Sequence, residues 1–224
     1  MKHATLVALS LALATSAHGE LIAGWNLALC PDGAQTYAAT AAAGGVTGMT
    51  MTRGAGLGVA FATQGNFNAW GWNQEATDYL SFGFTVANGS SVNLSTLQIG
   101  TRSEGGAPGV LALRSSVDGF GSDLFIFNQA ATDGGVWGPG AGFIFSVIDL
   151  SALTNLTGTV EFRIYQVGNT AANGGTPQTN RHFRLTNYYG VNPGDMSFTG
   201  TVVPAPGALA LLGLGGLVGG RRRR

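Results

Sequence analysis

In residues 159–167, "TVEFRIYQV", polar and apolar side chains alternate from Thr159 to Ile164. Successive side chains of an extended strand point to opposite faces, so one face would carry Val160, Phe162 and Ile164 and the other Glu161, Arg163 and Tyr165. Residues 79–86, "YLSFGFTV", repeat the pattern, with Leu80, Phe82, Phe84 and Val86 on one face. Both segments predict half-buried β-strands.

The same signals recur along the chain between glycine-rich turns. Further strands are predicted at 21–29, 57–63, 94–100, 109–115, 123–128, 143–148, 181–189 and 196–202. About ten strands without a long amphipathic helix are typical of an all-β, antiparallel β-sandwich, and we expect a jelly-roll-like one. One short helical turn is expected in "DLSALTNL", residues 149–156, capped by Asp149 or Ser151.

The composition favours a folded domain. Glycine occurs 37 times, which by itself would suggest disorder, but the chain also has 12 Phe, 4 Trp and 5 Tyr. No proline-rich or serine-rich linker divides the middle of the sequence, so residues 20–201 are expected to form one domain.

The first 19 residues have the three parts of a secretory signal peptide. Lys2 precedes an apolar run from Ala4 to about Ala14, and small residues follow at Ala17 and Gly19. Cleavage after either Ala17 or Gly19 fits this pattern. An exported protein is therefore predicted.

Residues 202–224, "VVPAPGALALLGLGGLVGGRRRR", form a different kind of segment. Gly207–Gly220 are uncharged and would make about 21 Å of helix, against about 30 Å of bilayer hydrocarbon. Counting from Val202, the stretch could just span a membrane. The arginines that follow would keep the C-terminus in the cytoplasm: Arg221, Arg222, Arg223 and Arg224.

A proline motif, a hydrophobic helix and a terminal arginine cluster together resemble the PEP-CTERM sorting signal of exported bacterial proteins. The motif here is Val203, Pro204, Ala205 and Pro206, with alanine where the family most often has glutamate. The resemblance implies a transient inner-membrane anchor, recognition by an exosortase-type transpeptidase, and an exopolysaccharide-producing Gram-negative host. The destination it implies is the cell surface or the extracellular matrix, with the C-terminal helix either removed or retained.

The middle of the chain also resembles ectodomains that carry this tail, in "ATDYLSFGFTV", "LALRSSVDGF" and "LTGTVEFRIYQVG". Such ectodomains have sandwich folds and largely unassigned activities. The resemblance therefore implies a fold but no ligand.

Charge and cysteine content exclude several classes of function. Without both terminal segments the chain would keep six arginines, no lysine and eleven acidic residues, a net charge of −5. Binding to nucleic acid requires clustered basic residues, so it is not expected. Cys30, the single cysteine, permits no intramolecular disulfide and has no basic neighbour in sequence to activate its thiol.

Few residues could support catalysis, and no enzymatic activity is expected. His182 is the one histidine certain to remain in an exported domain, and no Gly-x-Ser-x-Gly motif accompanies it. A polysaccharide hydrolase or lyase would need two carboxylates roughly 5–10 Å apart. Only the fold could bring such a pair together. The acids considered for such a pair are Glu75, Asp78, Asp118, Asp123 and Glu161.

Two binding hypotheses remain. Trp70 and Trp72, two residues apart, could form with Tyr79 a stacking platform for sugar rings, although burial in the core is the competing explanation. No cofactor is expected, but Asp118 and Asp123 could bind calcium unless the Asp118-Gly119 pair is simply a turn. The sequence thus predicts a structural or adhesive surface protein, with an exopolysaccharide-binding module as the alternative.

Overall fold

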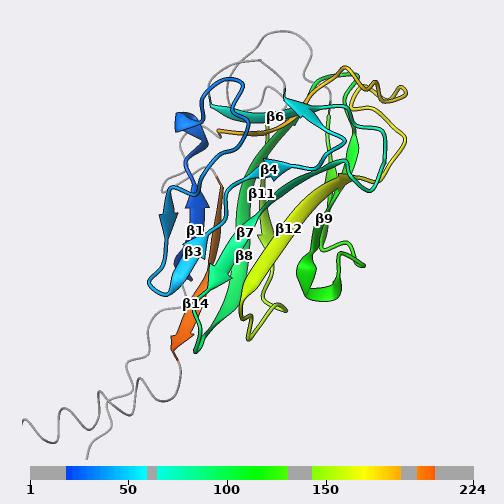
Figure 1. The fold of residues 1–224 in the computed structure, drawn as a ribbon. Helices are drawn as coiled ribbons and strands as arrows, with labels where there is room; N and C mark the ends of the chain where they lie inside the picture. Colours follow the sequence, from blue (N-terminus) through cyan, green and yellow to red (C-terminus); the bar gives the residue numbers. More distant parts are fainter. Residues whose placement is uncertain (1–18, 60–64, 131–142, 188–195, 205–224) are drawn as a thin grey trace, which may run out of the picture.

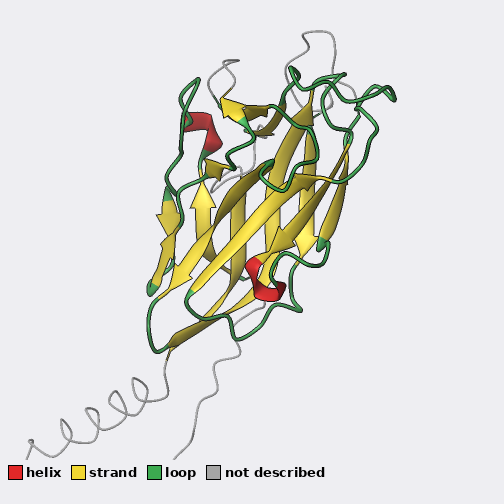
Figure 2. Ribbon diagram, turned by 45° about the vertical axis from the view of Figure 1, so that its right-hand side comes forward, coloured by secondary structure: helices red, strands yellow, loops and turns green. Residues whose placement is uncertain are grey.

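The computed structural model describes residues 19–59, 65–130, 143–187 and 196–204 (Figure 1). In these ranges the protein is all-β and is built from two antiparallel sheets. The two sheets face each other in a sandwich-like arrangement (Figures 1 and 2). The predicted all-β, sandwich-like fold is therefore confirmed.

The larger sheet contains eight strands. Its hydrogen-bonded order is β2 (Ala41–Ala42), β1 (Glu20–Trp25), β14 (Met196–Pro204), β8 (Ser90–Ser103), β13 (Phe183–Thr186), β6 (Asn66–Trp70) and β5 (Gly58–Val59). β11 (Ile144–Asp149) pairs with β8 as well. Residues 96–99 of β8 bond to both β11 and β14, so β8 lies between these two strands.

The smaller sheet contains six strands. They run in the order β10 (Phe125–Asn128), β9 (Val110–Ser115), β12 (Thr159–Gln166), β7 (Tyr79–Val86) and β3 (Val46–Gly48), and β4 (Thr52–Arg53) also pairs with β7. Two short 3-10 helices, η1 (Leu27–Leu29) and η2 (Ser116–Asp118), lie in loops and are the red segments of Figure 2.

Aromatic side chains from both sheets fill the space between them. Phe162 on β12 lies 4.7 Å from Phe198 on β14, measured between ring centroids, and Trp25 on β1 meets Phe82 on β7 edge-on at 6.0 Å. The predicted inward positions of β7 and β12 are all buried, at 0–3% exposure. Alternating burial of large apolar side chains is what holds the two layers together, since each buried side chain contributes about 1.5–3 kcal/mol.

Arg53 links the two layers by hydrogen bonds. It belongs to β4 of the smaller sheet, and its Nε donates to the backbone oxygen of Asn68 on β6 of the larger sheet at 2.6 Å. Its Nη1 donates to the backbone oxygens of Ala34 and Gln35, each at 3.0 Å, and its guanidinium lies 3.9 Å from the centroid of the Phe67 ring. Burial lowers the pKa of Arg53 to about 10, so the side chain stays charged at neutral pH.

The predicted strands agree with the structure best where the alternation is strict. The segments 79–86 and 159–167 correspond to β7 and β12, whereas the predicted 94–100 strand extends to Ser90–Ser103. β6, with four of its five residues buried, was not predicted because burial on both faces removes the alternation. The predicted helical turn at 149–156 is wrong: Asp149 Oδ1 accepts from the Ser151 amide at 2.9 Å, but the chain forms only an isolated turn.

The predicted signal peptide at 1–19 and the sorting segment at 202–224 lie largely outside the described residues. The structure therefore describes only Gly19 of the first and Val202–Pro204 of the second. In the described part of the chain, no helix has the length and apolar character needed to cross a bilayer.

Candidate binding surface

The outer face of the smaller sheet carries aromatic and arginine side chains in register. Tyr165 on β12 lies directly opposite Tyr79 on β7, and Arg163 on β12 lies directly opposite Arg114 on β9. Phe120, which follows η2, joins them in space. We call these five residues, Tyr79, Arg114, Phe120, Arg163 and Tyr165, the aromatic–arginine face.

Arg163 lies between two of the rings. Its guanidinium carbon is 4.1 Å from the ring centroid of Tyr79 and 4.1 Å from that of Phe120. Tyr165 completes the group, 5.5 Å from Tyr79 and 6.5 Å from Phe120 between ring centroids. Cation–π contacts of this kind are worth about 0.5–1 kcal/mol each at exposed sites, so together they favour this arrangement of the rings.

A carboxylate holds Arg163 in this position. Glu161 accepts from Arg163 Nε at 2.7 Å and from Nη2 at 3.1 Å, and the Ser81 hydroxyl donates to the same carboxylate at 2.6 Å. Burial alone would raise the pKa of Glu161, but the hydrogen bonds from Arg163 and Ser81 lower it below the usual range. Burial would likewise lower the pKa of Arg163, and the bonds to Glu161 and Tyr165 raise it instead. Both groups are therefore charged at neutral pH.

Arg114 is paired in a similar way at the neighbouring position. Its Nε donates to Asp123 Oδ1 at 2.6 Å, and its guanidinium lies 5.4 Å from the ring centroid of Tyr165. The two arginines of the aromatic–arginine face thus each have an acidic partner. Two like charges placed opposite each other across strands would otherwise repel.

A cavity of about 440 Å³ opens beside this face. This volume is within the range of about 300–1,000 Å³ that is usual for small-molecule sites. Aromatic rings, charged side chains and amides all contribute to its lining, which consists of Gln74, Glu75, Ala76, Arg114, Phe120, Tyr165, Gln166 and Val167.

Two residues that line the cavity have left-handed backbone. Among the described non-glycine residues, φ is positive at Gln74 (61°), Phe120 (64°) and Asn155 (54°), and the first two belong to the cavity. Such a conformation costs about 1–3 kcal/mol and persists where the surrounding structure imposes it, most often at functional sites. The strain is therefore concentrated at this cavity.

Buried groups of the β6–β7 loop hold Gln74 and Glu75 at the rim. Asp78 is 2% exposed, and its Oδ2 accepts from the backbone amides of Asn73 at 2.8 Å and Glu75 at 3.1 Å. The backbone amide of Asp78 in turn donates to the Glu75 oxygen at 2.9 Å. This closed turn leaves the side chains of Gln74 and Glu75 exposed.

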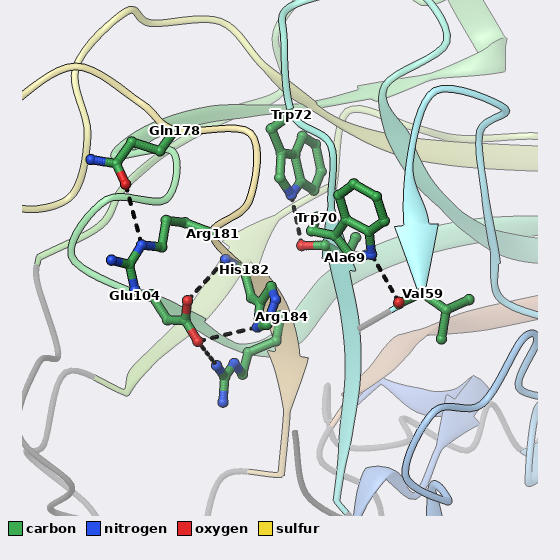
Figure 3. Close-up of polar contacts among 9 residues, drawn as sticks. All are labelled: Val59, Ala69, Trp70, Trp72, Glu104, Gln178, Arg181, His182 and Arg184. Carbon is green, nitrogen blue, oxygen red and sulfur yellow. Dashed lines mark hydrogen bonds and ion pairs between the residues drawn. The ribbon is translucent and has the colours of Figure 1, made fainter. Parts of the chain in front are cut away.

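The predicted platform of Trp70, Trp72 and Tyr79 does not form. Figure 3 shows that the two tryptophans have separate hydrogen-bond partners, Val59 and Ala69. Trp72 is 1% exposed and packs edge-on against Phe183 at 5.7 Å, with its Nε1 donating to the Ala69 oxygen at 3.0 Å. Trp70 is 43% exposed, but its ring covers Gly58 and its Nε1 donates to the Val59 oxygen at 2.9 Å. β6 ends at Trp70 and Gly71 has φ 100°, so the two indoles do not share a face.

Of these three residues, only Tyr79 belongs to the aromatic–arginine face. It lies on β7 of the smaller sheet, whereas Trp70 ends β6 of the larger one. Its partners are Arg163 and Tyr165.

The two predicted calcium ligands have other roles in the structure. Asp118 Oδ1 accepts from the Gly121 amide at 3.2 Å, as expected for a turn, and Asp123 pairs with Arg114. The hydrogen bonds of Asp118 to Ser122 and Gly121 lower its pKa. Within the described ranges, no three His, Cys, Asp or Glu side chains gather as a metal site would require.

His182 belongs to an ionic cluster on the larger sheet rather than to a catalytic triad. Its Nδ1 lies 3.2 Å from Glu104 Oε1, and Arg184 Nη2 donates to the same oxygen at 2.8 Å (Figure 3). Burial would raise the pKa of Glu104, but hydrogen bonds and charge from His182, with the charge of Arg184, hold it at about 2. For Arg184 burial dominates, and its pKa is lowered despite Glu104.

The two described residues of the predicted sorting motif, Val203 and Pro204, belong to strand β14. Val203 pairs with Ser91 and Pro204 with Ser90 across β14 and β8. Both residues line a separate, uncharged cavity of about 360 Å³ at this end of the sandwich. The remaining residues of the predicted signal, Ala205, Pro206 and Arg221–Arg224, lie outside the described residues.

Comparisons of the sequence with known proteins identify no family for this chain. No protein-family model matches the chain. A search of curated proteins likewise gives no match.

Sequence reasoning placed three residues of the aromatic–arginine face on outer faces but did not predict the group of five. Tyr79, Arg163 and Tyr165 were predicted to point outward, but the strand patterns did not indicate that Arg114 and Phe120 would lie beside them. The one local signal is "DGF", residues 118–120, in which a turn pair is followed by an aromatic residue.

Proposed function

We propose that this chain is an exported bacterial surface protein that acts as an adhesin by binding polysaccharide. The proposed site is the cavity beside the aromatic–arginine face. Sugar rings stack on aromatic side chains, while amides and charged groups form hydrogen bonds with the sugar hydroxyls. The proposal joins the adhesive role expected from the sequence to a site of the kind that glycans use.

The observation that carries the proposal is that half-buried aromatic rings pack around Arg163, one of them on a strained backbone. Phe120 has φ 64°, and its ring lies against Arg163 and Tyr165. Rings ordered before binding lose little entropy when a ligand arrives, which favours weak, repeated contacts along a polymer.

We propose binding without catalysis. A glycosidase needs one carboxylic acid with a raised pKa beside a second carboxylate. Of the acids considered, Asp78 is used in a turn, Asp123 and Glu161 are paired with arginines, and the pKa of Glu161 is lowered. These roles support a binding site.

The proposed route to the surface depends on the terminal sequences. Residues 1–19 would direct export, and residues 202–224 would hold the domain at the inner membrane for an exosortase-type transpeptidase. Mass spectrometry of the surface form tests this route. The expected mature protein begins after Ala17 or Gly19 and lacks Arg221–Arg224; an intact arginine-rich end on the surface form would contradict processing.

We also propose that the topology is a jelly-roll variant. The chain repeatedly crosses between sheets: β6 to β7, β7 to β8, β8 to β9, β10 to β11 and β12 to β13 each change layer. Such alternation is the support for this assignment.

Binding is tested with a glycan array and two aromatic variants. Tyr165→Ala removes a ring of the cavity and is expected to weaken glycan binding by about tenfold, the scale of one lost aromatic contact. Trp70→Ala removes an exposed ring on the other sheet and serves as the matched control. Loss of binding in Trp70→Ala alone would contradict the proposed site, and release of reducing sugar by the unmodified chain would contradict a purely binding role.

A further inference from the structure

The charges around the cavity are unevenly matched. Arg114 and Arg163 each have an acidic partner, Asp123 and Glu161, with the closest nitrogen–oxygen distances at 2.6 and 2.7 Å. Glu75 also lines the cavity, and it is exposed. Among the described residues, Glu75 belongs to none of the ion pairs, which join Arg114 to Asp123, Arg163 to Glu161, and His182 and Arg184 to Glu104. The cavity thus offers one carboxylate whose charge no neighbouring arginine or histidine neutralises.

The rest of the domain adds to this negative character. Residues 20–201 contain six arginines and no lysine against eleven acids. A field of this sign raises the local concentration of cationic ligands and lowers that of polyanions.

On this basis we propose that the cavity selects an amino sugar, a hexosamine whose amine is free and protonated. The inference depends on the proposed polysaccharide binding and names the ligand class. The pyranose ring stacks on Tyr165 or Phe120, and its ammonium group donates to the carboxylate of Glu75. A charge-assisted hydrogen bond of this type is stronger than one between neutral groups.

The same arrangement disfavours an acidic sugar. A uronate would approach Arg114, whose Nε already donates to Asp123, and would meet repulsion from Glu75. An N-acetylated sugar would retain the ring contact but lose the ionic one. The three kinds of sugar therefore have a predicted order of affinity: amino, N-acetylated, uronate.

The experiment measures binding of the full-length chain to three oligosaccharides of equal length: oligoglucosamine, its N-acetylated form and oligogalacturonate. Glu75→Gln keeps the size of the side chain and removes its charge. Glu20→Gln makes the same change at an exposed position on β1 of the larger sheet and is the control. Tyr165→Ala reports whether binding occurs at the cavity at all.

We expect oligoglucosamine to bind about fivefold more tightly than its N-acetylated form, the upper range for an exposed ion pair, and to lose this advantage at high salt. Glu75→Gln should abolish the preference, and Glu20→Gln should retain it. Equal binding of the two forms, both dependent on Tyr165, would overturn the amino-sugar inference and leave the proposed function intact. Tighter binding of oligogalacturonate would overturn the inference too, whereas absence of binding to all three and to the glycan array would overturn both.

Discussion

The guanidinium of Arg163 lies 4.1 Å over the ring of Phe120, a residue whose own backbone is left-handed. Phe120 follows Gly119, also left-handed at φ 70°, and its amide donates to the Ser115 oxygen at 2.8 Å. Two successive left-handed residues turn the chain back over the sheet. The ring contacts with Arg163 offset part of the backbone strain, so the wall of the cavity depends on this one relationship.

Two substitutions of Phe120 distinguish the contribution of its ring to stability from the cost of its backbone conformation. Phe120→Ala loses the ring contacts but retains the strain, whereas Phe120→Gly loses the contacts and relieves the strain. We expect the glycine variant to be more stable than the alanine variant by about 1 kcal/mol in urea denaturation. Both should bind glycans more weakly than the unmodified chain. If the alanine variant were as stable as the glycine variant, the left-handed backbone at residue 120 would carry no strain.

Glu104 should make the stability depend on acid pH. Its pKa is about 2 in the folded protein against an ordinary 4.5, so its stabilising effect is complete above pH 4.5 and disappears as the pH falls toward 2. Glu104→Gln should cost about 2 kcal/mol of unfolding free energy at pH 7 and much less near pH 2. Urea titrations at several pH values measure this. A cost independent of pH would indicate a loss of packing rather than of charge.

Arg53 should be important for joining the two sheets. Arg53→Met keeps much of the aliphatic stem but leaves the backbone oxygens of Ala34, Gln35 and Asn68 without their donor. We expect a loss of about 3 kcal/mol of unfolding free energy. Arg181→Met is the matched control, because Arg181 is exposed and should lose less than about 0.5 kcal/mol.

Cys30 should be unreactive while the protein is folded. The thiol is fully buried, and burial raises its pKa to about 11, although the charge of Arg53 acts in the opposite direction. Only the thiolate reacts with alkylating reagents. Iodoacetamide labelling at neutral pH should therefore be slow in buffer and fast in denaturing urea. Rapid labelling of the folded chain, measured by mass spectrometry, would contradict this burial.

The fold was predictable where one face of a strand is polar. Strict alternation located β7 and β12 and even the inward phenylalanines that meet Phe198. β6 was missed since it is buried on both faces, and β3 and β4 were missed because two or three residues are too few to show a period.

The site was less predictable than the fold because it depends on register. Alternation put Tyr79 and Tyr165 on outer faces, but their position opposite each other follows from the pairing of β7 with β12, which one-residue slips would destroy. The tryptophan pair was misleading for a local reason. Gly71 breaks the strand between the two indoles, so a spacing of two residues no longer means a shared face.

The position of β14 has a consequence for the timing of folding. This strand, Met196–Pro204, lies between β1 at the start of the domain and β8 in its middle, and it pairs with both. The larger sheet therefore cannot be completed until residues 20–204 have all been synthesised. Until then β1 and β8 would expose unpaired edges, which are prone to wrong association. A chain built in this way folds late and as one unit, and protection of the unfinished domain until β14 has been synthesised becomes a condition of its assembly.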